Sequence, residues 1–241
     1  MAGRRNRWRW FALALVVMTV SASAVCQPVE AASSRSAGPA VVTRSLPPAR
    51  GDRVYGATLS ASGGRSPYRW RVAGLPGGLS LSGNRIVGQP TQAGSFQVAV
   101  AVTDGAGHQA ARTLLLVVLN PAQVDAMARL NADRVALGRH PLGWQLDMSA
   151  AAQAWATHLA QTGPPLTHDL SNWRPPCANG PNTAWAENVG YGRTVAEVEA
   201  AFMASPHHRP NILNPNFTTA MTAVVYAGGW YYVVQRFTKG C

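Results

Sequence analysis

The hydrophobic pattern of this chain of 241 residues changes its period near Asn120, and this change constrains the fold most strongly. From about Val41 to Leu119, apolar and polar residues alternate in short runs that are bounded by Gly and Pro. This pattern is typical of short β-strands. From Pro121 onward, apolar residues recur at helical spacing. We therefore predict two folded domains, at residues 41–119 and 120–241, which the length of the chain allows.

The first domain is expected to be all-β. The segment 95–102 alternates cleanly, with one buried and one exposed face. The expected buried residues are Phe96, Val98, Val100 and Val102, and Gln97, Ala99 and Ala101 lie on the other face. A tight turn at 82–84 joins strands at 79–81 and 85–87, because Gly83 and Asn84 tolerate a positive φ. With further strands at 54–59, 68–72 and 113–118, the segment predicts a β-sandwich.

The N-terminus has the pattern of a secretory signal peptide, assigned to residues 1–31. Four arginines precede an apolar stretch at 11–20, and small residues at 22–24 and 29–31 offer alternative cleavage sites. The apolar stretch is shorter than the roughly 20 residues of a spanning helix, so we expect no stable transmembrane anchor. Residues 32–40, rich in Ser and Ala, are expected to form a flexible leader. The predicted location is secreted, extracellular or periplasmic.

The chain is basic, with a formal charge of +11 that falls to +8 when residues 1–31 are removed. Such a protein adheres electrostatically to anionic polymers and lipid headgroups. The arginines are scattered and accompany no nucleic-acid-binding motif, so we expect no specific nucleic acid partner.

The second domain combines helices with a C-terminal hairpin. Helices are expected at about 122–137, 147–161 and 194–204, the first capped by Asn120 and the third by Thr194 in a capping box with Glu197. On the second helix, the residues expected to pack are Ala151, Ala154, Trp155 and Leu159. Strands at 219–226 and 230–237 flank two glycines. The fold class is therefore α+β, with helices around a sheet.

Three separate segments supply a candidate site. His168 follows Leu166-Thr167, Glu187 lies in Ala186-Glu187-Asn188-Val189, and His208 lies in a run that begins at Ser205. Two imidazoles and a carboxylate form a ligand set for a zinc-like cation and also an acid/base set. Ser205 is suited to cap a short helix that starts at Pro206, and successive helical residues point about 100° apart, so only one of the two histidines 207 and 208 can face the site.

Six blocks carry a family resemblance. They are Leu130-Asn131-Ala132-Asp133-Arg134, Pro141-Leu142-Gly143-Trp144, Ala154-Trp155-Ala156, Leu166-Thr167-His168, Ala186-Glu187-Asn188-Val189-Gly190 and the run 205–215. Together they resemble the bacterial branch of the CAP superfamily, the cysteine-rich secretory, antigen 5 and pathogenesis-related proteins. The resemblance implies an α-β-α sandwich with an open cleft, in which His168, Glu187 and His208 match the cleft residues. His207 occupies a position usually held by Gly, and the second cleft carboxylate of the family falls near Ser205.

The first domain resembles the bacterial immunoglobulin-like (cadherin-like) repeat. The matching segments are 63–70, 74–81, 88–96 and 102–104. The resemblance implies a spacer or adhesion module. Asp104 is expected to form a turn and not to bind calcium.

Three functions stay open for the site. We favour an extracellular or envelope binding or effector protein that acts through the His/Glu cleft. A metal-dependent hydrolase, protease-like, would use His168, Glu187 and His208 as zinc ligands or catalytic residues. A lipid or sterol carrier would use aromatic residues such as Trp173, Trp185, Tyr191 and Trp230. The expected partners are accordingly a lipid, sterol, glycan or cell-envelope polymer, and no oligomeric state is assigned.

The chain has three cysteines, a number that fits export. If Cys26 leaves with the signal peptide, Cys177 and Cys241 are the natural disulfide pair and would fix the chain end. If cleavage follows Ala24, Cys26 stays as an odd thiol.

Overall fold

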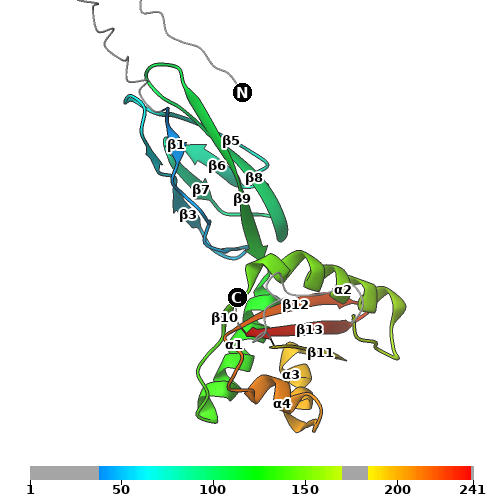
Figure 1. The fold of residues 1–241 in the computed structure, drawn as a ribbon. Helices are drawn as coiled ribbons and strands as arrows, with labels where there is room; N and C mark the ends of the chain where they lie inside the picture. Colours follow the sequence, from blue (N-terminus) through cyan, green and yellow to red (C-terminus); the bar gives the residue numbers. More distant parts are fainter. Residues whose placement is uncertain (1–37, 170–183, 240–241) are drawn as a thin grey trace, which may run out of the picture. The chain divides into compact units, whose positions relative to one another are not determined.

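The computed structural model describes residues 38–169 and 184–239, and it places the predicted change of architecture at Asn120. Within these residues, every element before Asn120 is a strand, and every helix follows it (Figure 1). No described helix is long and apolar enough to cross a membrane.

The first domain contains nine strands in three sheets. The strands are β1 (Ala40–Val41), β2 (Ala49–Arg50), β3 (Tyr55–Thr58), β4 (Ala61–Ser62), β5 (Arg69–Ala73), β6 (Leu79–Ser82), β7 (Arg85–Gly88), β8 (Gly94–Thr103) and β9 (Gln109–Leu119). The strand orders are β2-β9-β8-β5, β3-β7-β6 and β1-β4. All six predicted strands are present within a few residues. The two-residue strands β1, β2 and β4 were not predicted, because so few residues show no periodicity.

The alternation predicted for β8 is the basis of the first core. Val98, Val100 and Val102 are fully buried, whereas Gln97 and Ala99 are exposed. Gly83 occupies the β6–β7 turn with φ of 60°, the left-handed conformation expected there. A single alternating strand therefore identified both the core face and the solvent face of its sheet.

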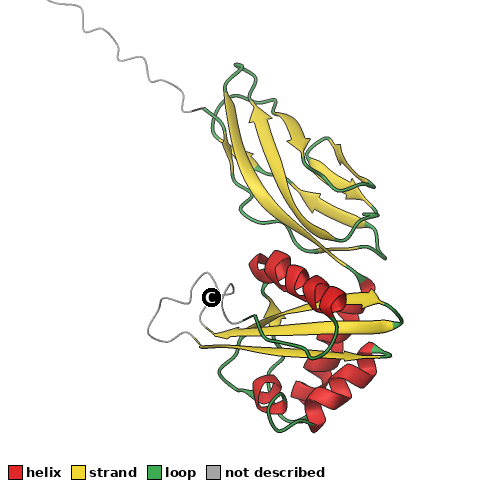
Figure 2. Ribbon diagram, turned by 90° about the vertical axis from the view of Figure 1, so that its right-hand side faces the viewer, coloured by secondary structure: helices red, strands yellow, loops and turns green. Residues whose placement is uncertain are grey.

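The second domain has a four-stranded sheet with helices on both faces (Figure 2). Its elements are α1 (Pro121–Ala136), β10 (Gly143–Trp144), the 3-10 helix η1 (Leu146–Met148), α2 (Ser149–Thr162), β11 (Ala184–Gly192), α3 (Val195–Ala204), α4 (Arg209–Leu213), β12 (Thr219–Ala227) and β13 (Trp230–Lys239). The strand order is β10-β12-β13-β11. Helix α2 covers one face, and α1 and α3 cover the other (Figure 2).

The helix starts largely follow their caps. Asn120 caps α1, and its side chain and that of Gln123 satisfy each other's backbone N–H groups. Thr194 caps α3 by accepting from the Glu197 N–H at 3.1 Å. The Glu197 carboxylate accepts from the Arg193 N–H, not from Thr194 as a closed capping box would require. Glu197 is therefore structural, as expected, but its carboxylate holds the backbone of Arg193, the residue before the cap.

The predicted packing face of α2 was partly wrong. Ala151 and Ala154 are exposed, and the buried stripe contains Ala152, Ala156 and Leu159. Alanines occur on every side of this helix, so hydrophobicity alone does not distinguish its faces.

Candidate functional site

Strand β11 carries the predicted carboxylate but was not predicted as a strand. It pairs antiparallel with β13, with Glu187 opposite Arg236 and Asn188 opposite Gln235. Adjacent residues of a strand point to opposite faces, so Glu187 lies on the face that α2 covers and Asn188 on the face of α1 and α3. The polar residues that interrupt β11 obscured its alternation in the sequence.

Glu187 forms the centre of a buried ionic cluster. Its Oε2 accepts a hydrogen bond from Arg236 Nε at 2.8 Å, and its Oε1 accepts from the Asp169 backbone N–H at 3.1 Å. Arg236 also donates from Nη2 to Asp169 at 3.0 Å. The side chains of Glu187 and Arg236 are almost completely excluded from solvent. One buried guanidinium therefore bridges two carboxylates and offsets the charge of one of them.

His168 joins this cluster from its exposed side. Its Nδ1 lies 3.1 Å from Glu187 Oε1, and 41% of its side chain is exposed. In the neutral form, a histidine that donates its Nδ1–H to a carboxylate carries a lone pair on Nε2. Glu187 therefore orients His168 and sets its tautomer, and the exposed ring can accept a hydrogen bond from a ligand.

His208 is held by the turn that precedes α4. Ser205 Oγ accepts hydrogen bonds from the N–H groups of His207 and His208 at 3.3 and 3.4 Å, although the helix itself starts only at Arg209. The His208 ring packs on Phe202, with ring centroids 5.0 Å apart. Burial, and then the nearby His168 and His207, lower the pKa of His208, so the ring is neutral at pH 7.

A groove of about 450 Å³ extends from His208 along the edge strand β11. Its lining is mainly apolar and consists of Pro164, Pro165, Leu166, Val189, Gly190, Tyr191, Val198, Ala201, Phe202, Ser205 and His208. His207 is exposed and does not line this groove. The groove therefore combines an apolar wall with one neutral imidazole, which the turn capped by Ser205 supplies.

A second polar network lies behind His208 on the other face of the sheet. Asn188 donates to the His208 carbonyl and to Gln235 Oε1, and Gln235 donates to Glu199 at 2.6 Å. Asn211 donates to Asn188 Oδ1 at 2.9 Å and fixes the amide further. Burial raises the pKa of Glu199 to about 7, and its Oε1 has no hydrogen-bond partner among the described residues.

Asp169, Arg236 and this network were not predicted from the sequence. Two adjacent polar residues, Gln235 and Arg236, interrupt the run of apolar and aromatic residues from Trp230 to Phe237 in β13, and this was the available signal. A buried polar residue in an apolar strand requires a partner, but a single sequence does not identify it.

The predicted zinc ligands do not form a three-ligand set in the described residues. No group of three or more His, Cys, Asp or Glu is placed there to hold a metal ion. Both Glu187 oxygens already accept hydrogen bonds, one of them from the cationic Arg236. His168 and His208 alone supply fewer protein ligands than a catalytic zinc site generally uses.

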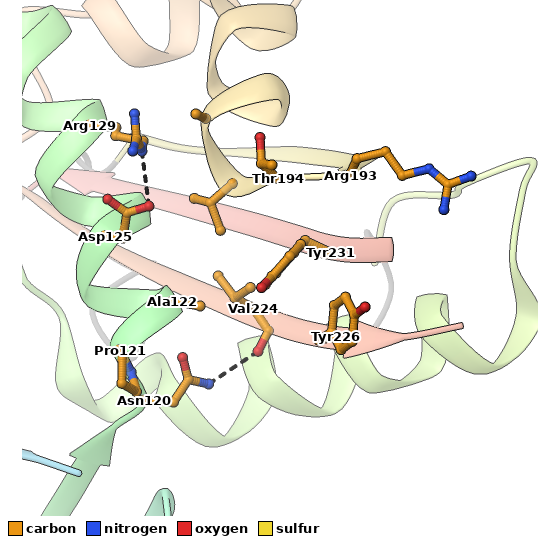
Figure 3. A pocket seen from close by; sticks show the side chains of 12 residues that line it. Asn120, Pro121, Ala122, Asp125, Arg129, Arg193, Thr194, Val224, Tyr226 and Tyr231 are labelled. Atoms are coloured by element: carbon orange, nitrogen blue, oxygen red, sulfur yellow. Dashed lines mark hydrogen bonds and ion pairs between the residues drawn. The ribbon is translucent and has the colours of Figure 1, made fainter. Parts of the chain in front are cut away.

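Neither histidine lines a larger groove, of about 750 Å³. Figure 3 shows this groove. The N-terminal ends of α1 and α3 form its sides, and Val224, Tyr226 and Tyr231 lie between them. The Asp125–Arg129 ion pair, at 2.9 Å, lies at one side. None of the predicted site residues lines this groove, so its size does not identify the predicted site.

Of the described aromatic residues proposed for an apolar ligand, only Tyr191 lines the groove beside His208. It also contacts Trp230 and Tyr232. Trp230 lies under the Arg193 guanidinium, 3.7 Å from the ring centroid. Trp185 is 38% exposed. Trp173, the three cysteines and the signal peptide lie outside the described residues, so their predicted roles stay predictions.

Two family models match the chain. Residues 127–237 match the CAP model, described as "Cysteine-rich secretory protein family", and residues 38–119 match "Putative Ig domain". Both predicted resemblances are thus confirmed, in the predicted order. No curated protein matches the chain.

The similar solved structures are distant. An outer surface protein of Borrelia burgdorferi is 17% identical, with a TM-score of 0.41, over 49% of this chain and 92% of that protein. A putative alpha-galactosidase/melibiase of Bacteroides fragilis is 21% identical, with a TM-score of 0.27, over 34% of this chain. The alignment spans only 18% of that second protein.

Proposed function

The chain carries a CAP domain preceded by an Ig-like domain, and from this premise we propose that it is an extracellular or envelope binding protein with an effector role. The binding site is the groove beside His208 together with His168 and Glu187. We propose an α-β-α sandwich for the CAP domain, with helices on both faces of its sheet, and a β-sandwich for the Ig-like domain.

The main support for this proposal is that no carboxylate oxygen of Glu187 is without a hydrogen bond. Both of its oxygens accept hydrogen bonds, from His168, the Asp169 N–H and Arg236. A general base needs an oxygen within hydrogen-bond reach of the proton that it abstracts. Glu187 is instead placed to orient His168, which supports recognition of a ligand over catalysis by this carboxylate.

The lining of the groove indicates the class of ligand. Leu166, Val198 and Phe202 offer an apolar surface, and the neutral His208 is able both to donate and to accept a hydrogen bond. A volume of about 450 Å³ suits a single chain or ring of moderate size. The proposed ligand therefore has an apolar part beside a hydrogen-bonding group, as in a fatty acid or a sterol.

Calorimetric titration with decanoate tests this assignment. Ala201→Trp fills the groove from an exposed position of α3, and Ala151→Trp places the same side chain on the exposed side of α2 as a matched control. We expect Ala201→Trp and His168→Gln/His208→Gln to lose binding, and Ala151→Trp to keep it. Equal binding by all four proteins would overturn the groove assignment.

A metal-dependent hydrolase is the second candidate. Its support is the Glu187–His168 pair, because a carboxylate that orients a histidine through Nδ1 is common behind metal-binding histidines. Zinc would act as a Lewis acid if it were held by His168 and His208. Titration of zinc into the wild type and a His168→Ala/His208→Ala variant tests this candidate. A one-to-one signal that the variant lacks would favour it, and identical signals would exclude it.

A further inference from the structure

The positive charge of this protein is concentrated in the Ig-like domain. Residues 38–119 contain eight arginines, two aspartates, and neither lysine nor glutamate, a formal charge of +6. Residues 120–241 contain eight basic and seven acidic residues. A domain with this imbalance attracts anions over its whole surface.

Neither aspartate forms an ion pair with any arginine of this domain other than Arg50 within the described residues. Asp104 is buried and accepts hydrogen bonds from the N–H groups of Arg65, Ala106 and His108. Asp52 pairs with Arg50 at 2.9 Å. The other seven arginines are exposed and form no ion pair within the described residues. Their guanidinium groups are therefore available to an external anion.

Two of these arginines border an uncharged face of small side chains. Arg69 and Arg71 lie on the same side of the edge strand β5, about 7 Å apart along the strand. Arg71 is in register with Ala101 of β8, which is in register with Ala111 of β9. The next row on this side contains Ala73, Ala99 and Thr113. We call this surface the Arg69/Arg71 face.

We propose that the Arg69/Arg71 face binds an extended acidic polysaccharide. Small side chains let a polymer lie flat across β5, β8 and β9, and guanidinium groups bind carboxylates with two parallel hydrogen bonds. The two exposed large apolar residues of this domain, Val42 and Val54, lie outside these strands, so the face has no exposed large apolar side chain to insert into a lipid surface. It also has no aromatic side chain on which a base would stack.

Binding of polygalacturonate oligomers to the full chain at low salt tests the proposal. We expect Arg69→Gln/Arg71→Gln to lower affinity about tenfold, because two charge-assisted contacts are lost. Arg53→Gln/Arg85→Gln removes the same charge from the same domain outside this face and serves as the matched control. We expect this control to retain most of its affinity.

Lysine substitution separates recognition from protection of the sheet edge, because charged residues on an edge strand also oppose aggregation. Arg69→Lys/Arg71→Lys keeps both charges but lacks the planar guanidinium that binds a carboxylate through two hydrogen bonds. We therefore expect an affinity between those of the wild type and the double Gln variant. Equal losses in the face and control variants, or no loss in either, would overturn the proposal. Tighter binding to vesicles of anionic phospholipid or to single-stranded DNA, at equal charge concentration, would assign the face to that partner.

Discussion

Glu187 and Arg236 lie opposite each other on β11 and β13, and Arg236 Nε donates to Glu187 Oε2 at 2.8 Å with both side chains buried. This contact ties the central residue of the predicted site, on the edge strand β11, to the neighbouring strand β13. It also explains why His168, in a separate segment, meets a carboxylate that is already held in place.

Arg236→Met is expected to destabilise the CAP domain strongly. It leaves Glu187 and Asp169 without their compensating charge, and breaking a buried ion pair costs about 3 to 5 kcal/mol. Urea denaturation measures the change in free energy of unfolding. The triple variant Arg236→Met/Glu187→Gln/Asp169→Asn removes all three charges, so we expect it to recover much of the loss. A single variant as stable as the wild type would contradict the structural role of the pair.

Because its carboxyl group is buried, Glu199 is expected to lower the free energy of unfolding of the CAP domain as pH rises. Burial raises the pKa of Glu199 to about 7, well above its unfolded value, so the folded state holds the proton more tightly. The stabilisation is complete below the unfolded pKa and is lost as pH rises through about 7. Between about pH 4 and pH 8 the wild type should lose roughly 2 to 3 kcal/mol through this group.

Glu199→Gln removes that dependence and is therefore expected to be the more stable protein at pH 8, with the advantage shrinking toward pH 4. Chemical denaturation across this range measures it. Glu197→Gln, at an exposed position of the same helix, should retain the wild-type pH dependence. Parallel pH profiles for the wild type and Glu199→Gln would show that Glu199 does not titrate as described.

Particular residues show how far the sequence specifies this molecule. The valines of β8 and the cap at Asn120 were predicted because local periodicity and capping chemistry determine them. Arg236, Asn188 and Glu199 were not, because their partners come from other elements. Glu187 was predicted through the family resemblance, but its neutralisation by Arg236 depends on the β11–β13 register, which a single sequence does not reveal.

His208 is expected to titrate below an ordinary histidine. Burial is the main cause of its lowered pKa, and the charges of His168 and His207 add to it. His168→Gln should therefore raise the pKa of His208 but leave it below 6.5, the ordinary value. Two-dimensional NMR of the imidazole resonances measures both values. His158→Gln, which alters an imidazole stacked on Trp155, should leave the pKa of His208 unchanged. A His208 pKa at or above 6.5 in the wild type would refute the description of its environment.

Asp104 is expected to stabilise the Ig-like domain through its charge. Burial alone would raise its pKa, but hydrogen bonds from Arg65, His108 and Ala106 outweigh that effect and lower the pKa to about 2. A depressed pKa contributes stability that is present above the unfolded value, near 3.9, and is lost as pH falls toward 2.

Asp104→Asn tests this role, because one of its two side-chain oxygens becomes an N–H donor facing backbone donors. Arg65 donates to Oδ2, and Ala106 and His108 donate to Oδ1, so either orientation of the amide breaks part of the set. We expect a lower melting temperature for this domain at pH 7 and a smaller loss of stability on acidification to pH 2.5. Asp52→Asn removes a carboxylate from an exposed ion pair and should change the melting temperature little. If Asp104→Asn has the same melting temperature as the wild type at pH 7, the carboxylate does not organise this turn. The three backbone N–H groups must then be hydrogen-bonded in another way.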